Sequence, residues 1–466
     1  MCSIFGSLLH NLDSAEKTQA ADSLIRHIMG ASRARGRDGV GWALQCQFTD
    51  NAWLNSYKNT VREGPVEHPK FTPTGQTVVN ANIIGNFRAE PTTEYVKNKR
   101  NNDQQPYCLD EWVVAHNGVI ANDKTLRTNK VDTEIDSAAI VEALMVQPQL
   151  TDTVHGAYST FRGAVKMLHG SYAILARTVY YSDTIFAAVN YRPLWYVVTE
   201  VGVFFASTAE YFPSELTPRA LEPYSTACFS YATGELVVTI DPLLEAPNQP
   251  RALVIASGGL DSTVAAAQVI KEGYDVELLH FEYGCRAEDK EVLAVTRIAD
   301  ALNLTLNRFP LNIYDKSDSA LFDKDSPIAG GEEGAEFAHE WVPARNLVML
   351  SIATAYAEAH EFDYIVLGNN LEEAGAYPDN EPEFVRRFNE VLPFAVGANK
   401  RVRVLMPVGD LMKHEIVALG LVNNAPMELT WSCYKNKELH CGKCGPCFMR
   451  RTAFEINNQE EVISYD

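Results

Sequence analysis

The chain has no long hydrophobic run and no leader-like start. No stretch reaches about 18 consecutive apolar residues, so we expect no transmembrane helix and no membrane partner. The first residues, Met1 to Gly6, lack both a basic region and a long apolar segment, which argues against a signal peptide. We therefore expect a cytoplasmic protein.

Positive charge and paired cysteines are also scarce. The chain has 40 Lys and Arg residues against 60 Asp and Glu, a net charge of -20, which argues against non-specific nucleic-acid binding through the overall field but leaves a local basic groove open. The nine cysteines are odd in number and four of them gather near the end, so reactive thiols and metal ligands are expected rather than a disulfide framework. Cys46, Cys108 and Cys228 have no partners at motif spacing and are interpreted as structural thiols.

The length of 466 residues is enough for two or three domains, and an apolar fraction of 46% with 21% charged residues is typical of globular proteins. A segment rich in proline and polar residues, Asp241 to Pro250, is interpreted as a linker. The predicted domains are therefore residues 1–240 and 251–466, joined by 241–250.

A phosphate-binding loop is the clearest motif. An apolar run, Ala252 to Ala256, precedes a turn rich in glycine and hydroxyls, and a helical pattern follows from Val264 to Gly273. This order directs backbone N–H groups and the positive end of a helix toward an anion, and glycine lets the backbone approach it closely. A plain loop is the alternative. The predicted phosphate contacts are Ser257, Gly258, Gly259, Leu260, Asp261, Ser262 and Thr263.

Strand-like and helical patterns alternate after the linker, which predicts a doubly wound, mostly parallel sheet with the loop after its first strand. One segment, Asp315 to Glu336, is acidic and glycine-bearing without periodicity, and is expected to be a mobile lid or simply disordered. The expected strands are Asp275 to Tyr283, Leu304 to Leu311, Asp363 to Gly368 and Arg401 to Met406, and the expected helices are Ala287 to Leu302, Arg345 to His360 and Leu411 to Leu419.

Four cysteines near the end, Cys433, Cys441, Cys444 and Cys447, have intervals of seven, two and two residues. Four thiolates at this spacing suit a tetrahedral zinc ion, and the glycines between them permit a tight knuckle. An iron–sulfur cluster or unliganded thiols are the alternatives. Because four protein ligands leave no open position, we expect a structural zinc.

The first half has one candidate nucleophile. Removal of Met1 would leave Cys2 with a free α-amine, whose reference pKa of about 8 suits it to act as base for the adjacent thiol. A cysteine at position two is unremarkable by itself. Its context is a set of short strings next to expected strands and helices. Gly85 to Ala89 and Val113 to Ile120 lie at strand ends, Arg35 to Gly41 precedes a strand and His169 to Leu175 begins one, and Asp132 to Glu134 opens a helix.

Each string has a functional and a structural interpretation. The Asn117 amide and the Gly118 N–H could stabilise an oxyanion, or the pair could be a hairpin turn. Taken singly, Asp132 could be the N-cap of an expected helix, Ile135 to Met145, and Arg88 could be an ordinary surface charge.

Together, and in this order, these strings resemble the class II glutamine amidotransferase domain, an N-terminal-nucleophile (Ntn) glutaminase, over about residues 2 to 240. The resemblance implies a four-layer αββα sandwich. It also implies that Cys2 forms a thioester with glutamine, that Asn117 and Gly118 hold the oxyanion, that Arg88 pairs with the glutamine α-carboxylate and that Asp132 holds its α-amino group.

The second half resembles the PP-loop ATP pyrophosphatases and, more specifically, the 7-cyano-7-deazaguanine synthase (QueC) family over residues 251 to 455. The matching strings are Ser257 to Thr263, Val342 to Asn346, Tyr377 to Asp379 with Pro382 to Phe384, and Trp431 to Tyr434 leading into the cysteines. The resemblance implies ATP, Mg²⁺ and Zn²⁺ as cofactors and Lys413 as a second phosphate contact. It also implies five substrate contacts, which are Arg345, Asn346, Glu373, Tyr377 and Asp379.

The chain departs from the QueC pattern in the expected substrate pocket. Tyr283-Gly284-Cys285-Arg286-Ala287 stands where the family has roughly Tyr-Gly-Gln-Arg-His, and Glu373 to Glu381 lacks an arginine and an aromatic residue. The phosphate loop and the four cysteines are intact. ATP binding therefore carries over from the resemblance better than the identity of the acceptor.

The two halves predict a glutamine-dependent amidotransferase of 7-deazaguanine biosynthesis. Ammonia released at Cys2 would reach an ATP-activated 7-carboxy-7-deazaguanine, giving the amide and nitrile, or a 7-cyano group, giving an archaeosine-type amidine, for tRNA or DNA modification. The partners are then glutamine, ATP and a 7-deazaguanine, with tRNA or DNA and a homo-oligomer as further candidates.

Two alternatives stay open. An asparagine-synthetase-like ligase shares the order of the halves, but the four cysteines and Val342 to Asn346 argue against it. A module that modifies deazaguanine already in nucleic acid would need a basic patch, although the overall acidity favours a free base. The candidates for that patch are Arg386, Arg387, Lys400, Arg401, Arg403, Arg450 and Arg451.

Overall fold

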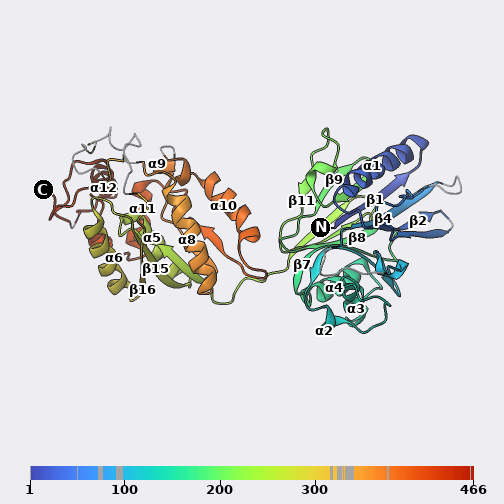
Figure 1. Ribbon diagram of the computed structural model, residues 1–466. Helices are drawn as coiled ribbons and strands as arrows, with labels where there is room; N and C mark the ends of the chain where they lie inside the picture. The colour runs from blue at the N-terminus through green and yellow to red at the C-terminus, as the bar shows by residue number, and fades with distance from the viewer. Residues whose placement is uncertain are drawn as a thin grey trace. The chain divides into compact units, whose positions relative to one another are not determined.

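The computed structural model describes residues 2–49, 51–71, 77–90, 98–314, 319–322, 328, 330, 341–374, 377–461 and 463–466, without the side chains of residues 373 and 374. The chain forms two compact units, Met1–Glu245 and Ala246–Asp466 (Figure 1). The expected lid, Asp315 to Glu336, lies largely outside the described residues. Within the described ranges, no helix combines the length and the apolar character that crossing a membrane requires.

The first unit contains a seven-stranded antiparallel sheet in the order β11-β9-β10-β1-β4-β2-β3. Its strands are β1 (Ser3–Leu12), β2 (Gly39–Phe48), β3 (Ala52–Asn59), β4 (Val78–Arg88), β9 (Trp195–Thr199), β10 (Gly202–Ala206) and β11 (Arg219–Ala220). A second, six-stranded antiparallel sheet has the order β13-β12-β8-β7-β6-β5. Its strands are β5 (Tyr107–Leu109), β6 (Trp112–Ile120), β7 (Gly170–Thr178), β8 (Thr184–Val189), β12 (Ser225–Ser230) and β13 (Val237–Pro242).

The two sheets pack face to face between layers of helices (Figure 1). Strand β1 shows why: Phe5 and Leu9 pack with helix α1, whereas Ile4 and Leu8 pack against the other sheet, as the two-residue period of a strand requires. The helices are α1 (Ala15–Arg33) on the first sheet, and α2 (Asp123–Leu126), α3 (Ala138–Met145) and α4 (Val154–Lys166) on the second. The predicted αββα sandwich is confirmed.

The start of helix α3 differs from the prediction. The sequence suggested a helix from Ile135, but α3 begins at Ala138. The Asp136 carboxylate accepts hydrogen bonds from the Ile120 N–H at 2.6 Å and the Ser137 N–H at 2.6 Å, and so ties this segment to the end of β6 before the helix starts. Strand β13 likewise continues to Pro242, two residues into the segment interpreted as linker.

The second unit has a five-stranded parallel sheet in the order β16-β15-β14-β17-β18. Its strands are β14 (Arg251–Ile255), β15 (Asp275–Glu282), β16 (Thr305–Pro310), β17 (Tyr364–Val366) and β18 (Arg403–Leu405). One face packs against α5 (Leu260–Lys271), α6 (Glu288–Leu302), α11 (Lys413–Val422) and α12 (Gly445–Ile456), and the other against α8 (Arg345–Ala359) and α10 (Pro382–Ala395). Helices on both faces confirm the predicted doubly wound sheet.

Short elements complete the two units. They are α9 (Leu371–Ala374) and the 3-10 helices η2 (Asn101–Asp103), η3 (Ala209–Tyr211), η4 (Pro378–Asn380) and η5 (Met427–Leu429).

An aromatic cluster under the second sheet of the first unit gives a stability prediction. The buried Phe186 ring lies 5.8 Å from the Trp112 ring, 6.0 Å from Tyr158 and 5.7 Å from Phe161, centroid to centroid. We expect Phe186→Ala to lower the free energy of unfolding by about 3–5 kcal/mol, because the cavity cannot fully collapse. Val198→Ala, at a side chain that is 53% exposed, should change it by less than about 0.5 kcal/mol.

Urea unfolding of the full chain, followed by hydrogen exchange of the first unit, measures both values. Equal effects of the two substitutions would contradict the packing argument.

Candidate functional site

The pairing of β1 with β4 places Cys2 next to Arg88. Ser3 pairs with Phe87, so the residue before β1 meets the end of β4. The Cys2 Sγ lies 3.4 Å from the Ala89 N and 3.5 Å from the Ala89 O. Burial raises the pKa of the Cys2 thiol, while the Ala89 hydrogen bond and the Arg88 charge oppose the rise. The thiol is therefore protonated near neutral pH, and attack by its sulfur requires a base.

Arg88 is buried beside Cys2, and one of its donor nitrogens is ion-paired without making a hydrogen bond to a described residue. Its Nη1 donates to the Asp103 carbonyl at 3.0 Å. Its Nη2 lies 3.7 Å from a Glu90 carboxylate oxygen and has no hydrogen-bond acceptor among the described residues. A buried guanidinium N–H without an acceptor is costly, so this atom suits the carboxylate of a ligand.

Asn117 and Gly118 lie near the end of β6. The Asn117 side chain is buried, and its Nδ2 has no acceptor within the described part of the chain. Gly118 has φ +149°, and a Cβ there would lie 1.8 Å from the Ser171 carbonyl oxygen, so only glycine fits. The Asn86 Nδ2 of β4 donates to the His116 carbonyl at 2.9 Å and joins this strand to the one that carries Arg88.

The two acidic residues after β6 have different environments. Asp132 has a side chain that is 75% exposed, and it is ion-paired with Arg100 at 2.8 Å. Asp136, by contrast, is close enough for its charge to raise the pKa values of both Cys2 and His116, although burial lowers the pKa of His116 overall. The sequence analysis missed Asp136, although its place just before an apolar helix pointed to a constrained carboxylate.

The predicted phosphate loop connects β14 to α5. The Gly259 N–H donates to the Ser257 Oγ at 3.2 Å, and the Thr263 hydroxyl donates to the Gly259 carbonyl at 2.8 Å. The buried Leu260 side chain anchors the turn in the core beneath α5. Gly258 has φ +79°, and a Cβ there would meet the Glu291 carbonyl oxygen at 2.7 Å. The Ser262 hydroxyl also donates to Gly259, at 3.3 Å.

Asp261, at the start of α5, meets two residues from distant parts of the chain. Its Oδ2 accepts from the Lys413 Nζ at 2.5 Å and from the Asn370 Nδ2 at 2.9 Å. Its Oδ1 is buried and has no donor among the described residues. The donor set, a carboxylate oxygen beside a lysine at a phosphate loop, fits a hard cation and a polyphosphate. The sequence analysis included Lys413 but missed Asn370, which follows β17.

The predicted substrate residues gather around the start of α8. The Asn346 N–H donates to the Asp379 carboxylate at 3.0 Å, and its side chain donates to the Asp379 carbonyl at 3.1 Å. The Arg345 Nη1 donates to the Tyr283 hydroxyl at 3.4 Å. The Tyr377 ring stacks on Trp341 with centroids 6.1 Å apart. The Glu373 side chain lies outside the described residues.

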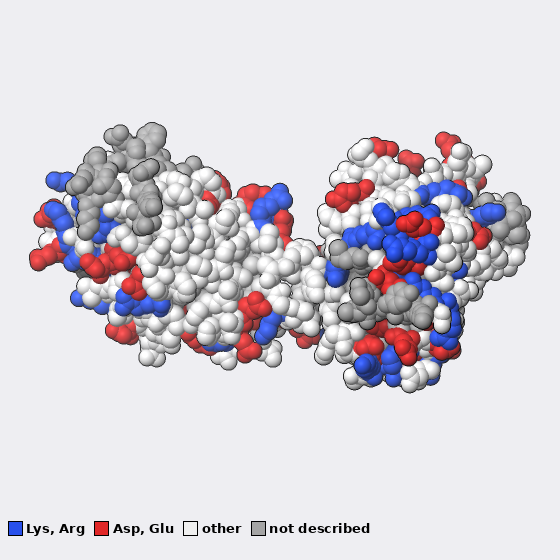
Figure 2. Space-filling model, viewed as in Figure 1, with Lys and Arg blue, Asp and Glu red and all other residues white. Residues whose placement is uncertain are grey.

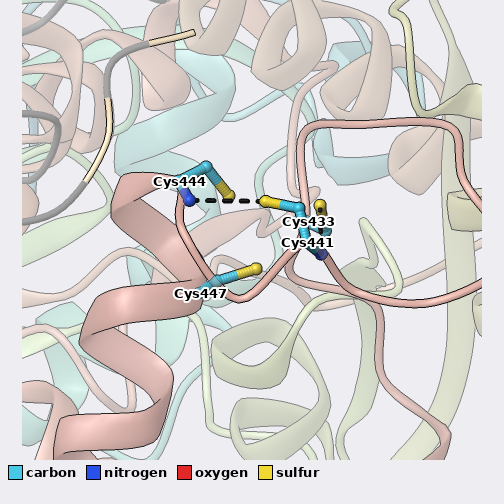
Figure 3. A group of neighbouring side chains, drawn as sticks. All are labelled: Cys433, Cys441, Cys444 and Cys447. Carbon is cyan, nitrogen blue, oxygen red and sulfur yellow. Dashed lines mark hydrogen bonds between the residues drawn. The ribbon is translucent and has the colours of Figure 1, made fainter. Parts of the chain in front are cut away.

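The four C-terminal cysteines converge. Their sulfurs lie within 4.8 Å of one another, all four side chains are buried, and Figure 3 shows the sulfurs pointing toward a common centre at the start of α12. The Cys441 N–H donates to the Cys433 Sγ and the Cys444 N–H to the Cys441 Sγ, each at 3.4 Å. Such N–H···S bonds stabilise thiolates, so the cluster fits a thiophilic metal. The Trp431 N–H donates to the Gly258 carbonyl at 2.9 Å and joins this region to the phosphate loop.

Three of the basic residues considered for nucleic acid are ion-paired or buried. Arg386 and Arg387 are both ion-paired with Glu383 and Glu390 on α10, and Arg450 is 1% exposed. On the face drawn in Figure 2, basic and acidic side chains lie next to one another. These contacts weaken the hypothesis of a nucleic-acid-binding module.

Comparison with known proteins agrees with both halves. Residues 251–458 match the family model described as queuosine biosynthesis protein QueC, and residues 93–214 match a glutamine amidotransferase domain. The chain is 41% identical over its whole length, and the whole length of the relative, to a 7-cyano-7-deazaguanine synthase of Saccharolobus solfataricus. The chain belongs to the 7-cyano-7-deazaguanine synthase family.

A second full-length relative, from Sulfolobus acidocaldarius, carries the same name and is 41% identical over all of both chains. A 7-cyano-7-deazaguanine synthase of Methanothrix thermoacetophila is 46% identical over 212 residues, which are 44% of this chain and 93% of the relative. The family thus includes members that match the whole of this chain and members that match less than half of it. The prediction of an ATP- and glutamine-dependent amidotransferase with a QueC-like domain is confirmed, and the asparagine-synthetase-like alternative loses its support.

The cysteine cluster gives a prediction on metal content. Cys444→Ser replaces a soft ligand with a hydroxyl, so we expect most of the bound metal to be lost and α12 to lose protection from hydrogen exchange. Cys108→Ser, at an exposed thiol in the first unit, is the control and should keep the wild-type metal content. Elemental analysis of the purified full chains measures this, and a full metal complement in Cys444→Ser would contradict the assignment.

Proposed function

We propose that the protein converts 7-carboxy-7-deazaguanine to 7-cyano-7-deazaguanine through the amide, with nitrogen from glutamine and activation by ATP. The observation that carries the proposal is the end-to-end similarity to a 7-cyano-7-deazaguanine synthase. It is supported by a Cys2 site and a phosphate loop, each with buried polar atoms that make no hydrogen bond to the described residues.

In the first unit, the Cys2 sulfur attacks the carboxamide carbon of glutamine after the α-amine has taken the thiol proton. The Asn117 Nδ2 and the Gly118 N–H donate to the oxyanion, and the Arg88 Nη2 donates to the α-carboxylate. We assign the α-ammonium group to Asp136 rather than Asp132, because the Asp136 charge acts on Cys2 whereas Asp132 is exposed and paired with Arg100. Collapse of the adduct releases ammonia and leaves a thioester for hydrolysis.

In the second unit, residues 257–263 and Lys413 bind the phosphates of ATP. Mg²⁺ would neutralise phosphate charge there, held by the free oxygen of Asp261. The substrate carboxylate attacks the α-phosphorus, pyrophosphate leaves, and ammonia then displaces AMP to give the amide. Adenylylation of the amide oxygen and loss of AMP give the nitrile.

The four cysteines hold a structural zinc in this proposal, because four thiolates complete a tetrahedral shell without an open position. Around the acceptor, Arg345, Asn346, Tyr377 and Asp379 line the side of the site formed by α8 and η4. The free base is the substrate class that the ion-paired basic residues favour over tRNA or DNA.

Mass spectrometry of the products tests the function. With 7-carboxy-7-deazaguanine, glutamine and ATP, the full chain should form the nitrile together with AMP and pyrophosphate. Cys2→Ala should lose glutamine-supported turnover by more than about 10³-fold while keeping ammonium-supported turnover, because only the nucleophile is removed. Cys228→Ala, at a buried cysteine of the second sheet, is the control for thiol loss. Formation of an amidine from the 7-cyano compound without ATP would overturn the proposed reaction and favour the archaeosine-type alternative.

A comparison of two aspartates tests the glutamine site. Asp136→Asn should lower kcat/KM for glutamine by about 10- to 100-fold, the loss expected when one charged hydrogen bond is removed. Asp132→Asn should change it by less than about threefold, since its partner is exposed. Glutamate release by each full-length variant is the measurement, and the reverse order would return the role to Asp132.

A further inference from the structure

We propose that Glu291 is the proton acceptor of the ATP-dependent half, taking the proton that ammonia must lose after it attacks the activated acyl carbon. The inference rests on the proposed function and adds a catalytic residue to it.

Glu291 lies against the phosphate loop. Helix α6 follows β15, the neighbour of β14 in the parallel sheet, so its first turns lie at the same carboxyl edge as the loop. The contact is direct, since a Cβ at Gly258 would lie 2.7 Å from the Glu291 carbonyl oxygen and 3.1 Å from the Val295 N. A carboxylate on this turn is within the part of the fold where ligands of doubly wound sheets bind.

The Glu291 carboxylate belongs to a small polar cluster. The Cys285 thiol donates to its Oε2 at 3.5 Å. The Arg345 guanidinium lies over the Tyr283 ring, 5.8 Å from the ring centroid, and donates a hydrogen bond to the Tyr283 hydroxyl. The titratable and charged groups that act on Glu291 are Tyr283 and Cys285 from the loop after β15, Arg345 from α8, and Glu288 from its own helix.

The surroundings of the Glu291 carboxylate give it a pKa that suits a general base near neutral pH. Burial raises the pKa of Glu291 to about 7, against the Cys285 hydrogen bond and the Arg345 charge, which lower it. General-base catalysis is most effective when the pKa lies near the working pH. Burial and the Glu291 charge also raise the pKa of Cys285, so its thiol is a donor that orients the carboxylate rather than a resting nucleophile.

The other carboxylate at the loop has a different role. The Asp261 carboxylate accepts hydrogen bonds from Lys413 and Asn370. Among the described residues, Glu291 has no such cationic hydrogen-bond partner, and its side-chain donor is the weak Cys285 thiol. The two groups thus divide phosphate binding from proton transfer.

The proton balance is simple. Ammonia attacks the acyl carbon, forming a C–N bond and a tetrahedral adduct with positive nitrogen. The Glu291 carboxylate takes one N–H proton, the C–O bond to AMP breaks, and AMP leaves with the electron pair, which yields the amide. The two N–H protons that the amide loses on becoming a nitrile leave through the same acceptor, which returns each proton to solvent between steps.

Glu291→Gln tests the proposal because it keeps the size of the side chain but cannot accept the proton. Adenylylation of a carboxylate needs no base, so ATP–pyrophosphate exchange with 7-carboxy-7-deazaguanine should stay within threefold of wild type. Amide formation from ammonium salt at constant free ammonia should fall by about 10²- to 10⁴-fold. The wild-type rate should fall as pH decreases through about 7, and the variant should lack this limb.

Asp289→Asn is the matched control, since it removes one negative charge from an exposed residue of the same helix and should leave both rates unchanged. Amide formation at the wild-type rate in Glu291→Gln, or equal loss of exchange and amide formation, would overturn the assignment. Loss of amide formation in Cys285→Ser with retention in Glu291→Gln would instead make the cysteine a nucleophile. A wild-type chain without exchange dependent on 7-carboxy-7-deazaguanine would refute the proposed function itself.

Discussion

In both sites the main chain of a distant segment lies so close to a glycine that no side chain would fit there. At Gly118 a Cβ would meet the Ser171 carbonyl at 1.8 Å, and at Gly258 it would meet the Glu291 carbonyl at 2.7 Å. Both residues also have φ values that favour glycine. In each unit this close approach lets strands or helices from distant parts of the chain converge on one backbone segment, and the polar groups of the site are positioned by that convergence.

Both sites also hold buried polar atoms that make no hydrogen bond to the described residues. They are Arg88 Nη2 and Asn117 Nδ2 in the first unit and Asp261 Oδ1 in the second. Leaving such atoms unpaired costs about 1–3 kcal/mol each or more for charged groups, a cost that a bound substrate or cation offsets. The structure thus holds its recognition groups in place before the ligands arrive.

The cysteine cluster contributes to the ATP half through the main chain. Trp431 lies two residues before Cys433, and its main-chain N–H donates a hydrogen bond to the Gly258 carbonyl. The Trp431 ring packs on the ring of His440, which is next to Cys441. A metal held by the four cysteines would therefore help to keep this side of the loop in position.

Local features carried much of the information in the sequence. The string Ser257 to Thr263 and the spacing of the four cysteines specify backbone geometry and ligand type within a few residues, so they predicted the loop and the convergence of the cysteines directly. The alternation of strands and helices similarly predicted the doubly wound sheet, because periodicity reports which face of each element is buried.

The remaining features required the tertiary structure. The charge of Asp136, which is tied to the end of β6, acts on Cys2, and Asn370 reaches Asp261 across 109 residues of chain. The pairing of Cys285 with Glu291 depends on where α6 starts after β15. Burial and through-space charge decide which of the many acidic residues belongs to a site. Both depend on how distant segments pack together, and no local sequence pattern encodes that packing.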